Sequence, residues 1–147
     1  MKESLHYLLM ANHLLFQKTL LTGIKDTELT SGQPKVLDYL RDHDGTVQKD
    51  IALACHIEPA TLTSVLAGME GKGLITRKPL NGNRRSLYVY LTDSGKELAM
   101  RVDAEFDNIE KKALSGFTPS EEAQLNALLS RIKNNMTMEG EKSNDKN

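Results

Sequence analysis

The stretch from Val47 to Thr92 carries an ordered series of helical and extended patterns. Two short helical patterns come first and are joined by a tight turn at residues 55–57. A glycine-rich stop at residues 71–73 ends the second pattern, and two extended runs follow around an Asn81-Gly82 turn. Helix, turn, helix and hairpin in this order predict a winged helix-turn-helix, a motif that reads nucleic acid.

Longer helical patterns lie on both sides of this stretch. Apolar residues at helical spacing predict a helix from Glu3 to about Thr22, and its other side is also apolar. A helix that is apolar on more than one face is buried on more than one face, which indicates a subunit interface. Two further helices are expected, one from about Asp93 to Leu114 and a last one that begins at Pro119 after a capping box.

Cap residues predict where the shorter helices begin. Thr30 and Gln33 have the spacing of a capping box, so a helix is expected to start at Thr30. Thr46 is expected to cap the next helix, and Pro59 suits the first position of the one after it. Thr92 is expected to cap the long helix that follows the hairpin.

The hairpin strands are expected at Leu74–Lys78 and Ser86–Leu91. Residues 87, 89 and 91 are apolar and should point inward, while the tyrosines at 88 and 90 point the other way. Pro79, Asn81 and Gly82 are expected to form the tip.

These patterns predict a mainly α fold with a small β-hairpin wing, a winged helix-turn-helix carried by long dimerisation helices. Residues 1–28 and 93–138 form the helical dimerisation region, and residues 29–92 form the DNA-binding region. Residues 139–147 are polar and are expected to be a disordered tail.

The bulk composition limits the possible classes of protein. The chain has 147 residues, of which 39% are hydrophobic and 27% charged, as in one soluble domain of ordinary size. No apolar run approaches the roughly 20 residues that span a bilayer, and the N-terminus lacks the pattern of a signal peptide. The single cysteine agrees with a reducing compartment. We therefore expect a cytoplasmic protein without a membrane partner.

Positive charge is concentrated in the predicted hairpin. Residues 71–92 contain no acidic residue, whereas the whole chain is formally −1, so the remainder carries −6. A basic hairpin on an otherwise acidic protein predicts a phosphate-bearing partner. The alternative is a solvated hairpin whose lysines protect a strand edge. The cationic residues are Lys72, Arg77, Lys78, Arg84 and Arg85.

The helix from Pro59 to Gly71 has a small, hydroxylated outer face that can lie in a major groove and offer short hydrogen bonds to base edges. The alternative is an ordinary packed helix. If the helix reads DNA, Gln48 and Lys49 would hold phosphate, and Arg84 or Arg85 would enter a narrow minor groove. The outer-face residues are Ala60, Thr61, Thr63, Ser64 and Gly68. The hydroxyls of Thr61, Thr63 and Ser64 are the candidates for base contacts.

Other chemistry finds little support in the sequence. Cys55 suggests either a redox switch or a structural thiol, and we favour the structural role. The four histidines have no metal-ligand spacing, so neither a metal nor another cofactor is expected. No phosphate-binding loop or nucleophile motif is present, so the sequence does not predict an enzyme.

The chain resembles the MarR family of bacterial transcription regulators over about residues 5–136, because several local signatures occur along it in the order and spacing of that family. The wing has Asn83 where the family usually has an Asp that orients the wing arginine, so the arginine placement is expected to differ. Ser64 stands where the family often has Arg, so base specificity is expected to be unusual or to rest on DNA shape. The signatures are Leu29-Thr30-x-x-Gln33, Gln48-x-x-Ile51-Ala52-x-x-Cys55-x-Ile57, Pro59-Ala60-Thr61-Leu62-Thr63, Glu70-Gly71-Lys72-Gly73-Leu74-Ile75-x-Arg77, and Asn83-Arg84-Arg85 followed by Val89-x-Leu91-Thr92-x-x-Gly95.

The resemblance implies a homodimer built from the first, fifth and sixth helices that binds a pseudo-palindromic double-stranded operator. It also implies a pocket for a small aromatic or lipophilic effector, for which His13, Phe16 and Tyr39 are candidate lining residues. The expected function is a sequence-specific transcriptional regulator, a repressor released by the effector. The alternative is a winged-helix module that binds protein and does not read DNA directly.

Overall fold

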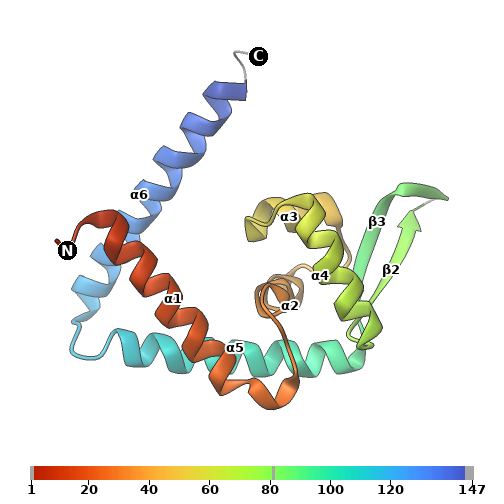
Figure 1. Cartoon of the computed structure of the whole chain (residues 1–147), viewed down its shortest axis with the longest axis horizontal. Helices are drawn as coiled ribbons and strands as arrows, with labels where there is room; N and C mark the ends of the chain where they lie inside the picture. The colour runs from red at the N-terminus through yellow and green to blue at the C-terminus, as the bar shows by residue number, and fades with distance from the viewer. Residues whose placement is uncertain (1, 81, 145–147) are drawn as a thin grey trace. The chain divides into compact units, whose positions relative to one another are not determined.

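The computed structural model describes residues 2–80 and 82–144, except for the side chains of residues 80, 83–85 and 138–144 (Figure 1). The chain divides into two compact units, Met1–Ile109 and Glu110–Asn147, and each is described by itself. In the described part, no single helix is long and apolar enough to cross a membrane. The helix pair Gln48–Cys55 and Pro59–Gly71, bent by 110°, meets that criterion only by length and composition.

The fold class predicted from the sequence is confirmed, since helices dominate and one small antiparallel sheet is present. The helix α5 begins in the first unit and ends in the second. The elements in order are α1 (Leu5–Gly23), the 3-10 turn η1 (Lys25–Thr27), α2 (Gln33–Asp42), β1 (Thr46–Val47), α3 (Gln48–Cys55), α4 (Pro59–Gly71), β2 (Ile75–Leu80), β3 (Asn83–Leu91), α5 (Asp93–Ala113) and α6 (Pro119–Asn144).

The start of α2 differs from the prediction. The helix begins at Gln33 and not at Thr30, because Gly32 adopts a left-handed conformation (φ +87°) that turns the chain just before the helix. Half of the expected capping box forms, since the Gln33 side chain accepts a hydrogen bond from the Thr30 N–H at 3.1 Å. The Gln33 N–H is bound by the Thr30 carbonyl at 3.1 Å instead of the hydroxyl.

A third strand replaces the cap expected at Thr46. Thr46 and Val47 form β1 and pair with Val89 and Tyr88 of β3, so the strand order is β1-β3-β2. The Thr46 hydroxyl donates to the His43 carbonyl, and α3 begins after Val47 without a side-chain cap. A strand of two residues is too short to show a period in the sequence, and its partner lies about forty residues further along the chain.

The hairpin is longer than predicted. β2 reaches Leu80 and β3 starts at Asn83, so Pro79 lies in a strand and not at the tip, next to an irregularity in the register. The expected alternation is confirmed for residues 89–91, because Val89 and Leu91 are buried while Tyr90 is exposed, but Leu87 and Tyr88 are both half-buried. Asn81, expected at the tip, lies outside the described residues.

The core of the first unit lies beneath α4 and draws on α2, α3, the sheet and α5. The side of α4 opposite its hydroxylated face is buried at Leu62, Leu66 and Met69, which are at most 1% exposed, and half-buried at Val65. α5 is tied to the N-terminal elements by ion pairs, Arg101 with Asp26 and Arg41 with Asp103. The burial of one side of α4 leaves its other face outward.

The N-terminus of α5 is joined to the end of α4. The Thr92 hydroxyl accepts a hydrogen bond from the Gly95 N–H at 3.1 Å, which confirms the predicted cap, and it donates to the Gly73 carbonyl at 2.6 Å. The Thr92 N–H donates to the Leu74 carbonyl at 3.0 Å. The backbone approach is so close that a Cβ on Gly95 would lie 2.0 Å from the Leu74 oxygen.

In the second unit, the predicted capping box before α6 is confirmed in full. The Thr118 hydroxyl accepts from the Glu121 N–H at 3.1 Å, and the Glu121 carboxylate accepts from the Thr118 N–H at 3.0 Å. The disordered tail predicted from Glu139 is not found as far as Asn144, since α6 continues to that residue. Once a helix is established, each added residue gains a hydrogen bond, so the polar residues extend it.

We expect Gly95→Ala to lower the free energy of unfolding by about 1–3 kcal/mol, because the new methyl group collides with backbone that cannot move aside. Helix propensity alone would favour alanine by up to about 1 kcal/mol. Gly71→Ala is the matched control, since a Cβ there meets nothing within 4 Å. Urea unfolding of both variants checks this, and equal stability of the two would contradict the close approach.

Candidate nucleic-acid interface

The outer face of α4 is exposed along its length. Ala60, Thr61, Ser64 and Gly68 are all exposed, as is Thr63, whose hydroxyl donates to the Pro59 carbonyl at 3.0 Å. Because that bond uses the hydroxyl proton, the oxygen can still accept a hydrogen bond. The sequence placed these five residues on one outer face, and the structure exposes all five, although at Gly68 the helix also packs against the side-chain amide of Gln33.

The turn between α3 and α4 sets the direction of this face. His56 ends α3 in the left-handed conformation (φ 52°), and the Ile57 N–H closes the turn on the Ala52 carbonyl at 3.0 Å. The two helices meet at 110°, and Pro59 occupies the first turn of α4. The N-terminal half of α4 and the start of α3 are therefore presented together (Figure 1).

Two residues predicted to touch DNA contact each other instead of standing free. The Arg77 guanidinium donates to Gln48 Oε1 at 3.3 Å and to both carboxylate oxygens of Glu70 at 3.1 and 3.4 Å. Its side chain is only 18% exposed, and the hydrogen bonds that it donates to the Glu70 carboxylate hold the pKa of that carboxyl below the usual value. Arg77 thus joins β2 to the start of α3 and the end of α4.

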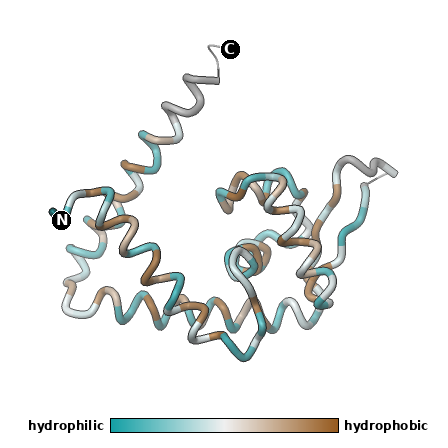
Figure 2. Tube along the Cα trace, viewed as in Figure 1, coloured by the Kyte–Doolittle hydropathy of each residue, from teal (hydrophilic) through white to brown (hydrophobic). Residues whose placement is uncertain are grey.

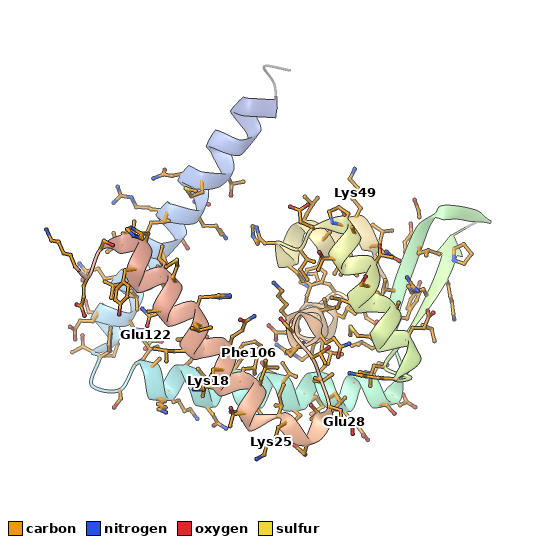
Figure 3. The ribbon with its side chains drawn as sticks, viewed as in Figure 1. Lys18, Lys25, Glu28, Lys49, Phe106 and Glu122 are labelled. Carbon is orange, nitrogen blue, oxygen red and sulfur yellow. The ribbon has the colours of Figure 1, made fainter. Side chains whose placement is uncertain are left out.

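The other cations predicted at the interface lie on α3 and on the hairpin. Lys49 is exposed at the start of α3 and points away from the body of the first unit, on the side opposite Lys25 (Figure 3). Lys78 lies over the Tyr90 ring, 5.6 Å from its centroid. Strand β3 contains Asn83, Arg84 and Arg85, but their side chains lie outside the described residues.

A cavity of about 460 Å³ lies between α1, the start of α2 and α5 within the first unit. His13 and Phe16 line it, as predicted, but Tyr39 does not: its ring stacks on His43, 4.4 Å between centroids. Tyr39 lies outside this cavity because it is one turn further along α2 than Lys35, which lines it. Sequence patterns do not reveal the remaining walls, since they come from three distant segments; the most polar are Asn12, Gln17, Ser31 and Lys35.

The sequence of this chain is similar to those of known DNA-binding regulators. The sequence model of the MarR family matches residues 29–87. The homoprotocatechuate degradative operon repressor of Escherichia coli is 32% identical over 108 residues, which cover 72% of each chain. The protein belongs to the MarR family.

Solved structures of two MarR-type regulators resemble it closely. The Staphylococcus aureus MepR–DNA complex is 28% identical, with a TM-score of 0.81 over 92% of this chain and 99% of that one. Bordetella bronchiseptica BpsR, whose DNA binding is regulated by 6-hydroxynicotinic acid, is 25% identical, with a TM-score of 0.79 over 89% and 94% of the two chains. Members of this family are transcriptional regulators and not enzymes, so this chain is a DNA-binding regulator.

The single cysteine of this MarR-family chain has the surroundings of a structural thiol. Cys55 is half-buried against the core, and its Sγ lies 3.7 Å from the Lys35 carbonyl. Burial raises the pKa of the thiol, which lowers the fraction of reactive thiolate. Among the described residues, no group of three or more His, Cys, Asp or Glu side chains could hold a metal ion.

Proposed function

We propose that the protein is a homodimeric repressor that binds a pseudo-palindromic operator through α4 and is released by a small aromatic acid. The observation that carries the proposal is the exposed face of α4, which is hydroxylated and carries no carboxylate before Glu70. A face of this kind can approach base edges without repelling phosphate. Family membership supports DNA as the partner, and the name of the Escherichia coli relative supports repression.

The contacts we propose follow from what each side chain can offer. Thr61, Thr63 and Ser64 face base edges in the major groove, and Lys49 holds phosphate beside them. Arg84 or Arg85 enters the flanking minor groove. Gln48 and Arg77 are hydrogen-bonded to each other, and they hold α3 and α4 in place instead of contacting DNA.

Dimerisation is supported by apolar surface that each unit leaves uncovered. On α1, Leu5, Met10 and Leu14 are 60–65% exposed, and Figure 2 shows hydrophobic residues recurring along the helix. On α6, Leu128 and Met136 are also exposed. Monomeric proteins rarely expose apolar surface over whole helices, so we propose that both helices are covered in a two-fold dimer.

An aromatic acid suits the cavity because its walls combine apolar surface with positive charge. Phe16 and Phe106 supply ring surface, while Lys35 and His13 are the lining residues that can carry a positive charge. The lining contains no acidic residue. The regulation of the neighbour BpsR by 6-hydroxynicotinic acid supports this class of effector. Release requires that the acid bind more tightly to a form of the protein that does not fit DNA.

We expect Arg84→Ala and Arg85→Ala each to weaken operator binding by about 1–3 kcal/mol if that arginine makes the groove contact. Lys49→Ala should instead weaken all DNA sequences equally and reduce the salt slope by about one unit. The measurement is a titration of DNA from upstream of the protein's own gene at several salt concentrations. Lys25→Ala, on the opposite side of the first unit, is the control and should change nothing (Figure 3).

If removal of both wing arginines leaves affinity and salt slope at wild-type values, the wing does not contact DNA. If the wild type itself binds no DNA, the protein-binding alternative takes over.

We expect sedimentation to show a dimer. An obligate interface of this kind should bury more than about 2,000 Å² in total. Leu14→Lys, in the exposed apolar face of α1, should promote dissociation because the dimer would have to bury a charge. Leu53→Lys is the matched control, since Leu53 is equally exposed but lies on α3. A wild-type protein that stays monomeric at all concentrations would refute the dimer and half-site recognition together.

We expect 6-hydroxynicotinate or salicylate to raise the thermal stability of the protein and to weaken its binding to the operator. Lys35→Met should reduce the affinity for salicylate but not for its uncharged amide, because only the acid needs a counter-charge. Tyr39→Phe, outside the cavity, should leave both affinities unchanged. An absence of any effect of these acids on melting temperature and operator affinity would count against this class of effector.

A further inference from the structure

Lys72 immediately follows the last residue of α4, and its side chain turns back onto the protein. Its ammonium group donates to the Glu28 carbonyl at 2.7 Å and to Gln33 Oε1 at 3.0 Å. Both acceptors belong to the segment 28–33, which connects η1 to α2. Two of the three ammonium donors are therefore bound about forty residues away in sequence, and a cation at this helix end also suits the helix dipole.

Gln33 is built into this connection. It is only 4% exposed, and the same Oε1 atom that binds Lys72 also accepts the Thr30 N–H at 3.1 Å. A charge-assisted hydrogen bond is shorter and stronger than a neutral one, so Lys72 is the strongest donor to this amide.

The segment 28–33 touches α4 at two more points. A Cβ on Gly68 would lie 3.0 Å from Gln33 Nε2, so the amide lies directly against the helix at that position. A Cβ on Gly32 would lie 3.1 Å from Val65 Cγ2. Together with Lys72, these contacts hold the C-terminal half of α4 from Val65 to its end.

The same segment forms part of the cavity wall. Ser31 and Gly32 line the cavity, as does Pro34 at the start of α2. A shift of this wall would therefore reach α4 through directly bonded and packed atoms, without passing through the core.

We propose that Lys72 is a positioning residue that fixes the recognition helix against the cavity wall, and that it is not a phosphate contact. This inference rests on the proposed function, because it assigns to Lys72 the orientation on which operator recognition depends. The sequence alone groups Lys72 with the phosphate-binding cations of the hairpin. A phosphate contact contributes equally to every DNA sequence, whereas orientation of α4 matters only where bases are read.

The decisive variant is Lys72→Met, which keeps the aliphatic stem and removes the ammonium. Gln33 Oε1 keeps its bond from the Thr30 N–H, so no buried acceptor is left without a partner and the fold should survive. We expect operator affinity to fall about tenfold, since a bond to a charged group contributes roughly that factor, while affinity for a scrambled duplex and the salt slope stay at wild-type values. Lys72→Arg, which retains charge and donors, should restore most of the selectivity.

The experiment measures binding to the operator and to the scrambled duplex by fluorescence anisotropy at several salt concentrations. Lys49→Met is the control for a phosphate contact, and Lys25→Met is the control for a cation remote from α4. A salt slope that drops by about one unit in Lys72→Met, with unchanged selectivity, would show a phosphate contact and overturn the proposal. Unchanged affinity for both duplexes would overturn it as well.

Hydrogen exchange of the wild type tests the same coupling without any variant, should Lys72→Met fail to fold. We expect amides of residues 28–33 and of the C-terminal half of α4 to gain protection together on the operator, but not on the scrambled duplex. Protection confined to α4 would refute the coupling. A wild type that cannot distinguish the two duplexes would refute the proposed function as well, whereas the outcomes for Lys72→Met concern this residue alone.

Discussion

The recognition helix depends on the backbone contact between the start of α5 and the connection that follows α4. Gly95 lacks a side chain where the Leu74 carbonyl approaches, and Thr92 bonds Gly73 and Leu74 at the same place. These contacts join backbone atoms and the Thr92 hydroxyl at the ends of two elements, so they leave little freedom in the angle between the helices. α5 begins at this contact, so a change in the position of α5 would also move residues 73 and 74, which lead into the hairpin.

The charges of the hairpin have two different physical roles. Arg77 and Lys72 are bonded to groups of the protein itself, on either side of the C-terminal end of α4. Such internal bonds hold α4 in orientation, but they leave less positive charge available to phosphate than the sequence suggests. In the proposed function, attraction to DNA depends on Lys49 and on the wing arginines, whereas Arg77 and Lys72 hold α4 in its orientation. Binding energy that depends on a stiff face discriminates between sequences better than charge does.

The segment 28–33 contacts both the cavity and α4, and in the proposed function this would link effector binding to DNA binding. The segment 28–33 faces the cavity through Ser31 and Gly32 and holds α4 through Gln33. An effector needs only to favour a different position of this segment to change how α4 meets a groove. Gly32 is suited to the position because its left-handed backbone lets the chain turn sharply between the cavity and Val65.

The sequence by itself determined the elements whose patterns are local. The buried stripe and exposed hydroxyl face of α4, the Thr92 cap and the Thr118–Glu121 capping box were all predictable, because each depends on residues within one or two turns. His13 and Phe16 were also placed correctly on the cavity wall, with the help of a family resemblance.

Only the tertiary structure decided which partners the long side chains and the shortest strand find. β1 exists because β3 is beside it, and the guanidinium of Arg77 and the ammonium of Lys72 bind groups 29 and 39 residues away. Tyr39 lies one turn beyond the cavity, and its ring stacks on His43, a contact that the sequence pattern does not indicate. A cation in a sequence carries the same charge whether it faces phosphate or an internal amide; packing alone brings an acceptor within reach, and that decides between the two roles.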